Sequence, residues 1–495
     1  MPALDTFLAE LLSDQQRLQT PVTRAATAHA LQPSAWRAER FRELIPLTAP
    51  APGQQYAFEV DLDSCSGCKA CVSGCHSLNG LDDEETWRDV GLAYGLSAAP
   101  VAQTVTTACH HCEDPACLNG CPVLAYEKDP VTGIVSHLDD QCIGCSYCVL
   151  KCPYDVPKYN ERLGIVRKCD MCHGRLAAGE APACAQACPT QAIKIVLVTT
   201  NTGSEASARL AALSGTDSSY TLPTTRYVSK RELPAAYRAA DADTLRPQHA
   251  HYALVALLTG TQLSLGLLVS AQLQTPHSQV QTFASAGLFF ASLAASVAHL
   301  GQPLRAWRIF LGLRRSWLSR EAVVLGAAAP FIALTAALAT PFTFITDLLN
   351  PWALVIGFSA VAATAVGVFC SAMIYIDTRR HFWRPANTFT RMGGTVLVAA
   401  LAFFAPAAAT AVLLAKLIAE RVLLRASTVS SRLHDGPLRT ANRTRLGLGL
   451  VAAVLFLFGQ SALGFVVFAV GELLERTLYF RAVDSPKMPG QPAAT

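Results

Sequence analysis

The sequence predicts an α+β domain rich in cysteine, followed by an all-α transmembrane bundle of eight helices. Sixteen of the 17 cysteines lie between Cys65 and Cys188. The chain of 495 residues is 51% hydrophobic and only 15% charged, with a mean hydropathy of +0.30, and the apolar excess lies after about residue 250. Arginines gather in alternate loops between the apolar segments. These observations separate a cysteine domain from a membrane domain.

The cysteines form four groups of four, three of which end in Cys-Pro. They read Cys65-x2-Cys68-x2-Cys71-x3-Cys75, Cys109-x2-Cys112-x4-Cys117-x3-Cys121, Cys142-x2-Cys145-x2-Cys148-x3-Cys152 and Cys169-x2-Cys172-x11-Cys184-x3-Cys188. The first and third groups have the spacing of bacterial ferredoxins, in which three thiolates hold one cluster and the fourth ligates the other cluster of a pair. Sixteen thiolates therefore predict four 4Fe-4S clusters. Cys370, alone in an apolar segment, is typical of a small buried hydrophobe.

Zinc and disulfides are two other uses of cysteine. Structural zinc needs two Cys-x2-Cys pairs for each ion and has no use for a third cysteine at x2 or a fourth at x3. Disulfides suit a small secreted chain, whereas Met1 to Arg40 shows no apolar core flanked by basic residues and predicts no secretory signal. The spacing therefore favours iron-sulfur clusters.

Composition divides the chain into five stretches. We expect an N-terminal extension over residues 1–55, with an amphipathic helix around Leu4 to Leu18 and a role in contacting a partner. The other four stretches are a cluster domain at 56–198, a polar linker at 199–250, a membrane anchor at 251–482 and a tail at 483–495. The net charge of +4 is too small to indicate nucleic acid as a partner.

The anchor consists of apolar segments that are each near the length needed to span a bilayer. They lie at about 251–272, 283–300, 321–340, 351–375, 388–405, 406–424, 446–461 and 462–480. The sixth follows the fifth directly through Ala405-Pro406, so one long kinked helix is the alternative. The sixth also contains Lys416 and Glu420, for which a salt-bridged pair that snorkels to the interface is the favoured interpretation.

The arginines favour eight spans over seven. With eight, every basic loop falls on one side of the membrane, together with the cluster domain and the tail. The positive-inside rule then predicts a multi-pass protein of the inner (cytoplasmic) membrane, with the iron-sulfur domain on the cytoplasmic side. The basic residues after the second, fourth, sixth and eighth segments are Arg305, Arg308, Arg314, Arg315, Arg320, Arg379, Arg380, Arg384, Arg391, Arg425, Arg432, Arg439, Arg443, Arg445, Arg481 and Lys487.

These motifs resemble two subunits of one enzyme family. The cysteine groups, including Cys109-His-His-Cys-Glu-Asp-Pro-Ala-Cys117 and Cys142-Ile-Gly-Cys-Ser-Tyr-Cys148, resemble the iron-sulfur electron-transfer subunit of the dimethyl sulfoxide reductase family of molybdoenzymes. The membrane half is similar to that family's eight-helix anchor subunit. The matching stretches there are His299-Leu-Gly-Gln-Pro-Leu-Arg305, Trp317-Leu-Ser-Arg-Glu321, Gly471-Glu-Leu-Leu-Glu-Arg476 and Pro486-Lys-Met-Pro-Gly490. The protein thus resembles a natural fusion of the two subunits.

The resemblance implies a double ferredoxin-like fold and a ligand set for each cluster. The four sets are Cys65, Cys68, Cys71 and Cys188; Cys169, Cys172, Cys184 and Cys75; Cys109, Cys112, Cys117 and Cys152; and Cys142, Cys145, Cys148 and Cys121. Some relatives carry tryptophan at the position of Cys145 and a 3Fe-4S cluster, so the cysteine here implies four cubanes. The basic residues Lys69, Lys151, Arg167 and Lys168 either raise cluster potentials or are solvated surface charges, which is the favoured interpretation.

The clusters need a partner at each end. The sequence shows no dinucleotide or P-loop motif and no molybdenum site, so the protein is expected to be a non-catalytic subunit. The resemblance implies a large molybdopterin catalytic subunit at one end and a quinone or quinol in the lipid-embedded anchor at the other. His299, Glu321 and, for orienting the headgroup, Arg305 are the candidate quinone residues. No haem is expected, because the spans contain no histidine pair. Glu472 and Glu475 remain ambiguous.

The expected role is electron transfer between a molybdoenzyme and the quinone pool. A quinone site at the cytoplasmic end predicts electroneutral turnover. The substrate and direction stay open: reduction of an S- or N-oxide is one interpretation, and a cytoplasm-facing sulfite dehydrogenase is the alternative. A redox-driven ion-translocating module and a free-standing quinone-ferredoxin oxidoreductase are two further hypotheses.

Overall fold

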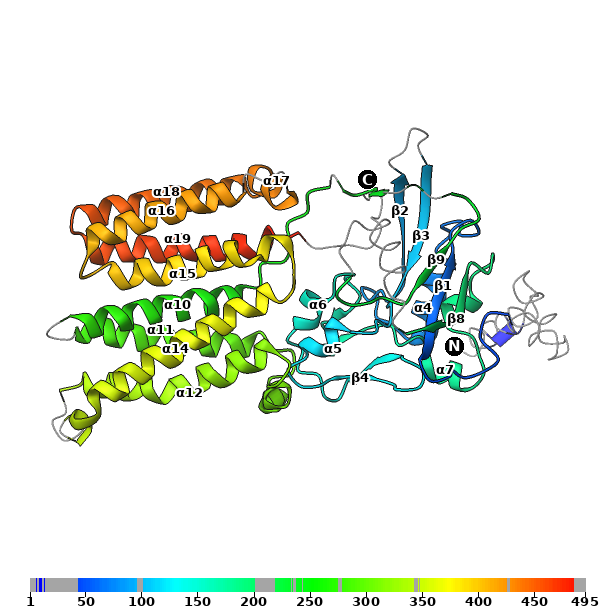
Figure 1. Ribbon diagram of the computed structural model, residues 1–495, viewed down its shortest axis with the longest axis horizontal. Helices are drawn as coiled ribbons and strands as arrows, with labels where there is room; N and C mark the ends of the chain where they lie inside the picture. Colours follow the sequence, from blue (N-terminus) through cyan, green and yellow to red (C-terminus); the bar gives the residue numbers. More distant parts are fainter. Residues whose placement is uncertain are drawn as a thin grey trace.

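The computed structural model describes residues 43–95, 101–200 and 219–484, apart from short gaps at 233, 235–236, 243, 275–277, 342–345, 347 and 425–427, together with residues 6, 9, 10 and 13. The helix expected around Leu4 to Leu18 and the tail lie almost entirely outside these residues. Figure 1 shows an elongated molecule, with an α+β domain at one end and a bundle of long helices at the other. The division expected from composition is therefore visible in the fold.

Two three-stranded sheets and two hairpins form the α+β domain. In the first sheet, β1 (Gln54–Asp61) lies between β8 (Ile193–Thr199), which is antiparallel to it, and β9 (Arg226–Val228), which is parallel. The second sheet has the order β10 (Tyr237–Ala239), β2 (Asp89–Gly95) and β3 (Val101–Thr107). The hairpins are β4 (Tyr126–Lys128) with β5 (Val135–His137) and β6 (Lys158–Asn160) with β7 (Ile165–Arg167).

The predicted linker, residues 199–250, contributes two strands to the α+β domain. Its strands β9 and β10 each join one of the sheets of the α+β domain. Thr224 Oγ1 also donates to the carbonyl of His110 at 2.8 Å, beside the second cysteine group. Short edge strands need few apolar residues, so a segment that contains them can keep a polar composition. For this reason its composition indicates a linker. The described part of residues 219–250 therefore belongs structurally to the domain.

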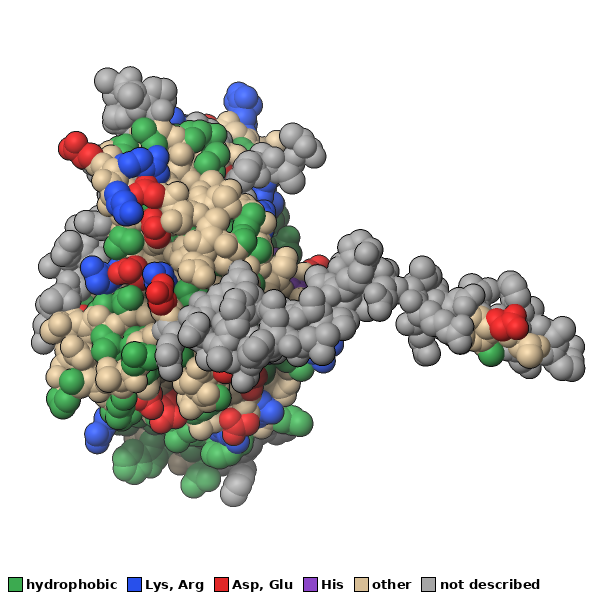
Figure 2. Space-filling model, turned by 90° about the vertical axis from the view of Figure 1, so that its right-hand side faces the viewer, with side chains coloured by type: hydrophobic (Ala, Val, Ile, Leu, Met, Phe, Trp, Pro, Cys, Tyr) green, Lys and Arg blue, Asp and Glu red, His purple; other side chains and the backbone are tan. Residues whose placement is uncertain are grey.

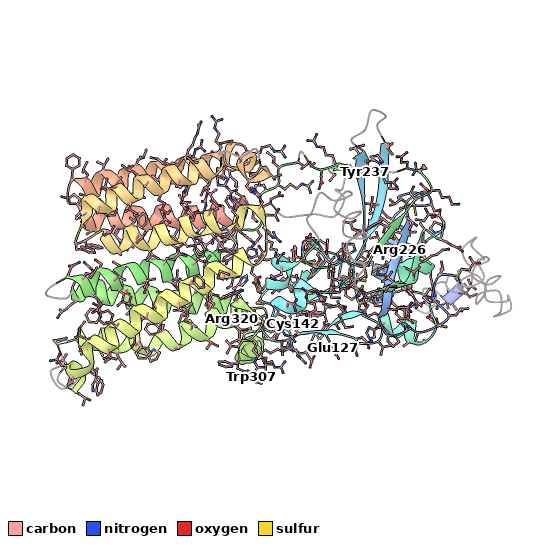
Figure 3. The ribbon with its side chains drawn as sticks, in the orientation of Figure 1. Glu127, Cys142, Arg226, Tyr237, Trp307 and Arg320 are labelled. Carbon is pink, nitrogen blue, oxygen red and sulfur yellow. The ribbon has the colours of Figure 1, made fainter. Side chains whose placement is uncertain are left out.

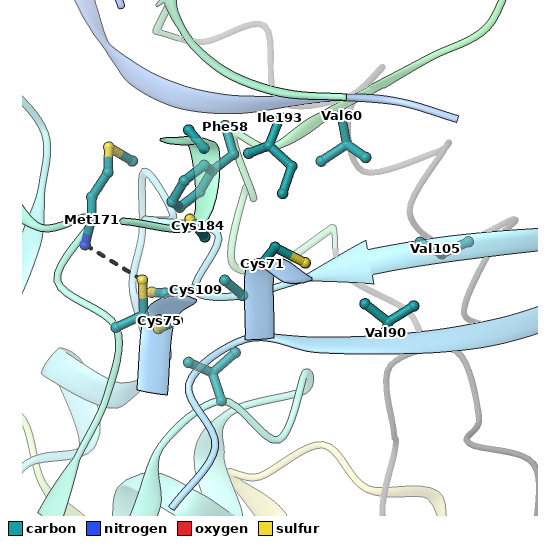
Figure 4. Close-up of a cluster of buried hydrophobic side chains, with 14 of the residues drawn as sticks. Phe58, Val60, Cys71, Cys75, Val90, Val105, Cys109, Met171, Cys184 and Ile193 are labelled. Atoms are coloured by element: carbon teal, nitrogen blue, oxygen red, sulfur yellow. Dashed lines mark hydrogen bonds between the residues drawn. The ribbon is translucent and has the colours of Figure 1, made fainter. Parts of the chain in front are cut away.

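Short helices follow or enclose the cysteines. They are α4 (Ala70–Asn79), α5 (Ala116–Gly120), α6 (Tyr147–Lys151), α7 (His173–Ala177) and α8 (Ala183–Gln186). Buried apolar residues of β1, β2, β3 and β8, including Phe58, Val90, Val105 and Ile193, pack around several of the cysteines (Figure 4). Several cysteine side chains thus lie within the hydrophobic core of the domain.

Eight helices of 17 to 24 residues form the described helical half. They are α10 (Tyr252–Leu273), α11 (Gln279–Ala298), α12 (Trp317–Leu338), α14 (Ala353–Ile376), α15 (Pro385–Leu401), α16 (Pro406–Leu424), α18 (Arg439–Leu457) and α19 (Ser461–Arg481). Shorter elements join them: η1 (Pro303–Gly312), η2 (Asn350–Trp352), η3 (His381–Trp383) and α17 (Val429–Asp435). The fifth and sixth segments are two separate helices, because α15 ends at Leu401 and α16 begins at Pro406.

Four of these helices are long and apolar enough to cross a membrane: Tyr252–Leu273, Gln279–Ala298, Trp317–Leu338 and Asn350–Ile376. In Figure 1 they form one group, while α15, α16, α18 and α19 form a second group beside it. Charged residues lower the hydropathy of the second group. The membrane topology of all eight helices is part of the proposed function.

Several charged residues of the second group are buried in ion pairs. Arg391 of α15 pairs with Glu475 of α19, and Arg445 of α18 pairs with Glu420 of α16. Lys416 Nζ lies 3.0 Å from the Glu420 carboxylate, and the Lys416 side chain is 1% exposed. The expected ion pair is therefore confirmed, but the expected snorkelling is wrong. Glu420 of the same helix and Glu472 of α19 supply the counter-charge within the bundle, so the ammonium does not need to reach the interface.

Five of the arginines assigned to loops lie within long helices instead: Arg320 in α12, Arg391 in α15, and Arg439, Arg443 and Arg445 in α18. Two of them are also buried. Arg391 lies within α15 and Arg445 within α18, and their side chains are 0% and 2% exposed. Arg445 falls in a predicted loop because the seventh segment is predicted from residue 446, whereas α18 begins at Arg439. Arg391 already lies inside the fifth predicted segment, 388–405, and should have been assigned to it. Both still lie near the helix ends that carry the remaining arginines, so the charge asymmetry is unchanged.

Candidate functional site

The four Cys-x2-Cys loops share one backbone conformation. The residue before the second cysteine has a positive φ in every group: 72° at Gly67, 41° at His111, 69° at Gly144 and 58° at Met171. A left-handed residue at this point bends the loop so that backbone N–H groups face the first cysteine of the pair. Accordingly, the backbone N–H groups of Gly144 and Met171 donate to the sulfurs of Cys142 and Cys169, each at 3.4 Å.

The cysteines that precede proline repeat a second geometry. Cys121 Sγ accepts from the backbone N–H of Ala125 at 3.2 Å, and Cys188 Sγ accepts from that of Ala192 at 3.3 Å. Both bonds span four residues, and each follows a short helix, α5 or α8, that carries another cysteine. Hydrogen bonds of this kind stabilise thiolates that ligate metal and tune iron-sulfur clusters.

The fold brings the cysteines into four neighbourhoods. Cys109, Cys112, Cys117 and Cys152 line one pocket together with His110 and Lys168. Cys71 lies near Cys65 and Cys188, while Cys75 lies near Cys172, Cys184 and Cys169. The last neighbourhood contains Cys121, Cys142, Cys145 and Cys148. Figure 4 shows Cys71, Cys75, Cys109 and Cys184 converging within one core. Cys68 is exposed and lies on the loop of the first group.

The donor set fits iron-sulfur clusters. Among the described residues, no three His, Cys, Asp or Glu side chains converge as the ligands of a single metal ion do. Burial raises the pKa of the Cys75 thiol to about 12 and the pKa values of Cys121 and Cys152 to about 11. Buried thiols of this kind ionise when a metal centre supplies positive charge. A bound cluster supplies that charge and one-electron chemistry, and the loops hold its ligands.

Of the basic residues expected near the ligands, Lys168 is the one buried against a cysteine sulfur. Its ammonium donates to the carbonyls of Val135 and Cys169 and lies 3.6 Å from Cys109 Sγ. Arg167 is paired with Glu85 at 3.0 Å, and Lys69 is exposed. The sequence reasoning missed Arg88, which is 2% exposed beside the first and fourth groups. Only its position directly after Trp87, at the start of a strand, hinted at burial.

The third cysteine group packs on the end of α14. Tyr147, between Cys145 and Cys148, donates its hydroxyl to the carbonyl of Ile374 at 3.1 Å. Lys151 Nζ lies 2.6 Å from Asp377 Oδ2. Both bonds join the α+β domain to the helical half. Lys151, for which a solvated surface charge is the favoured interpretation from the sequence, is instead buried in an ion pair between the two halves.

A second set of contacts joins the halves through η1 and the loop before it. The backbone N–H groups of Gln302 and Gly312 donate to the carbonyls of Ile143 and Pro122, at 3.0 Å and 2.8 Å. Arg305 Nη1 donates to the carbonyls of Asp139 at 3.0 Å and Cys142 at 3.2 Å. Figure 3 shows Cys142 at this boundary, with Arg320 on the helical side. Arg305 is thus engaged in holding the domain, which differs from the headgroup contact expected of it.

The predicted quinone residues flank a group of aromatic side chains at the same boundary. This aromatic group consists of Tyr375, Phe382, Trp383, Tyr479 and Phe480, and Tyr147 packs against it. His299 follows α11, and its Nε2 is buried without a partner among the described residues. Glu321, in the first turns of α12, is 4% exposed and accepts a hydrogen bond from Ser371.

The aromatic group connects these two residues. The His299 ring lies 5.6 Å from that of His251, whose ring lies 5.6 Å from Phe480. Phe480 lies 5.5 Å from Tyr375, which is near the Glu321 carboxylate. The contact between His251 and His299 was not expected, because the two residues are 48 positions apart and each marks only a segment end in the sequence.

Comparison with known proteins is consistent with this geometry. The family described as the 4Fe-4S dicluster domain matches residues 101–197. The B subunit of anaerobic dimethyl sulfoxide reductase of Escherichia coli (strain K12) is 38% identical over 148 residues, which are 28% of this protein and 72% of that one. The nitrate-inducible formate dehydrogenase iron-sulfur subunit of the same strain is 34% identical over 173 residues, 30% of this protein and 57% of that one. Hydrogenase-2 operon protein HybA of Escherichia coli O157:H7 is 36% identical over 171 residues, 29% of this protein and 52% of that one.

The fold and the site define a ferredoxin-like 4Fe-4S protein whose cluster domain precedes a helical region with four apolar candidate spans. Through that domain, the protein belongs to the family of oxidoreductase iron-sulfur subunits that includes the B subunit of anaerobic dimethyl sulfoxide reductase. It is accordingly an iron-sulfur electron-transfer protein, and the family resemblance of the cysteine half is confirmed.

Proposed function

We propose that this protein is the electron-transfer and membrane-anchor subunit of a molybdopterin oxidoreductase complex. It passes electrons between a separate catalytic subunit and the quinone pool through four 4Fe-4S clusters. The cysteine half is supported by its relatives, which are iron-sulfur subunits of oxidoreductases. The helical half is the fused anchor, with eight spans in the inner membrane and the cluster domain on the cytoplasmic side. The basic helix ends on the side of the cluster domain support this orientation.

The proposed clusters follow the four neighbourhoods of cysteines and form a line. The first cluster, on Cys65, Cys68, Cys71 and Cys188, is the outer one, since Cys68 is exposed. The second, on Cys75, Cys169, Cys172 and Cys184, adjoins the third, on Cys109, Cys112, Cys117 and Cys152, because Cys169 is near Cys109. Tyr126 lies near both Cys117 and Cys148, and so between the third cluster and the fourth, on Cys121, Cys142, Cys145 and Cys148.

The observation that carries the proposal is the position of the fourth cluster. Its loop packs directly on the aromatic group that His299 and Glu321 flank. A quinone bound between these residues would have a hydrogen-bond partner for each carbonyl and a carboxyl that exchanges protons. Glu321 supports this role, because its one hydrogen-bond partner among the described residues is a neutral hydroxyl, that of Ser371. Arg305 fixes the fourth cluster against this site by its bonds to the domain backbone.

The outer face of the domain is the proposed contact for the catalytic subunit. Figure 2 shows that face with acidic and basic side chains interspersed among apolar ones, and neither sign of charge dominates. Such a mixed surface suits a protein partner better than nucleic acid. The relatives named above do not favour the sulfite dehydrogenase alternative, so the substrate is best identified from the complex itself.

Purification of the protein from its source under mild detergent tests the proposal. We expect a large molybdopterin subunit to co-purify, with iron for four cubanes in this subunit and quinone-linked turnover of the large subunit's substrate. Assays of S-oxide reduction and of sulfite oxidation would then establish the direction. Isolation of this protein alone, active in passing electrons between quinol and ferredoxin, would contradict the proposed complex.

Turnover should be electroneutral. The proposed quinone site lies at the same end of the helices as the cluster domain, so protons and electrons are handled on one side. The second helix group packs against α10 through apolar residues such as Leu263, Phe456 and Phe468. In proteoliposomes, a voltage-sensitive dye should report no membrane potential during quinone turnover, whereas an ionophore control should respond. A potential that builds with turnover would favour the ion-translocating alternative.

A further inference from the structure

Arg88 is a buried cation in the cluster domain. Its side chain is 2% exposed, and its guanidinium carbon lies 4.6 Å over the ring of Phe58. Nη1 donates to Thr106 Oγ1 at 3.2 Å, and the same hydroxyl lies 3.4 Å from Cys71 Sγ. Nε and Nη2 have no hydrogen-bond partner in the described part of the chain. The guanidinium is therefore held in place while two of its donors remain unused.

The negative groups near Arg88 are cysteines of two different sets. Its charge interacts with Cys71 of the first set and with Cys184, Cys169 and Cys75 of the second. Within the described residues, it forms no ion pair with a carboxylate. An unpaired charge inside a protein is strongly destabilising, so a buried arginine requires a counter-charge. Here the ligating thiolates of two neighbouring clusters are the groups able to supply it.

We propose that Arg88 is the shared counter-cation of the first and second clusters and that it raises the reduction potential of both. A 4Fe-4S cluster with four thiolates is an anion, and it gains one further negative charge when it accepts an electron from its neighbour in the line. A fixed positive charge therefore favours the reduced form of each cluster. The guanidinium stays protonated, so it adds no proton to the electron transfer. This inference rests on the proposed cluster assignment.

Arg167 provides a matched comparison within the same domain. Its guanidinium also lies over an aromatic ring, that of Trp87, at 5.1 Å. It is paired with Glu85 at 3.0 Å, so its charge is already neutralised. Removing the Arg167 charge should therefore leave the cluster potentials nearly unchanged, which separates a specific effect of Arg88 from a general loss of positive charge.

The test is a redox titration of the full complex, followed by EPR, for the wild type and for Arg88→Gln, Arg88→Lys and Arg167→Gln. Glutamine keeps a donor for Thr106 but removes the charge, whereas lysine keeps the charge. We expect Arg88→Gln to make two of the four clusters about tenfold less reduced at a fixed potential, a shift of about 59 mV for a one-electron couple. Arg88→Lys should restore most of this loss, and Arg167→Gln should match the wild type.

Each outcome decides the proposal. Four clusters at unchanged potentials in Arg88→Gln would overturn it. If Arg88→Gln loses the two clusters and Arg88→Lys keeps them, the positive charge is needed for the pair to assemble, which supports the role. Loss of the two clusters in both variants would contradict the proposal, because it would show that the shape of the guanidinium is needed and that a positive charge alone is not enough. If the unaltered protein holds fewer than four clusters, the cluster assignment fails instead, and iron analysis shows this without any variant.

Discussion

Quinone-linked turnover should fall at least about 100-fold in Glu321→Gln, and likewise in His299→Ala, while all four clusters remain intact by EPR. Glutamine has the shape of glutamate and can still bond to Ser371, but it cannot exchange protons. Histidine to alanine removes the ring whose Nε2 is buried without a partner among the described residues. Turnover with a soluble dye in place of quinone should be unchanged, because the dye bypasses the membrane site.

Cys370→Ala is the matched control for this experiment. Cys370 lies on α14 beside Ser371 and near Glu321, but it has no part in the proposed proton exchange. Its loss should leave quinone turnover within about twofold of the wild type, since one small buried side chain is exchanged for another. Normal quinone turnover in both Glu321→Gln and His299→Ala would discard the site.

Glu475→Gln should have the largest effect on stability, about 3–5 kcal/mol. The Glu475 carboxylate pairs with both Arg391 and Arg476, whose side chains are 0% exposed. Removing its charge leaves two buried guanidinium groups without this partner. Thermal unfolding of the detergent-solubilised protein, followed by helical circular dichroism, would measure the change. Combining Glu475→Gln with Arg391→Gln should recover part of the loss, since one unpaired cation is then removed.

Asp435→Asn controls for the loss of an ion pair as such. The Arg421–Asp435 pair joins α16 of that group to α17, but its side chains are 48% and 65% exposed and its atoms are 3.7 Å apart. Its loss should change the stability by less than about 1 kcal/mol. If Asp435→Asn and Glu475→Gln lowered the stability equally, burial of the interior ion pairs would not increase their contribution to stability.

Local patterns in the sequence are sufficient to predict the cysteine loops and the helices. Most neighbouring cysteines in each group are separated by two to four residues, so their spacing in the sequence indicates how they are arranged on the loop. The sixth apolar segment is predicted at 406–424, and the helix runs from Pro406 to Leu424. Here the proline that begins the helix and the change in composition occur in the same place, which makes the boundary readable.

Features that depend on distant residues are not predictable in this way. Arg88 meets Cys184 across nearly one hundred positions, and no local pattern marks either as the partner of the other. Lys416 and Glu472 are 2.6 Å apart on different helices, so the sequence indicates snorkelling where the fold provides an interior partner. Strands β9 and β10 are three residues each, too short for an alternating pattern to be recognised.

The positions of β9 and β10 have a consequence for biogenesis. Both strands complete sheets of the cluster domain, and β10 ends at Ala239, shortly before α10 begins at Tyr252. During synthesis, therefore, every strand that the structure describes in the domain leaves the ribosome before α10 does. We expect the domain to fold and receive its iron while the nascent polypeptide is still unattached to the insertion machinery. Maturation of the metal centres and integration into the bilayer would then be successive stages of translation, in an order fixed by the gene.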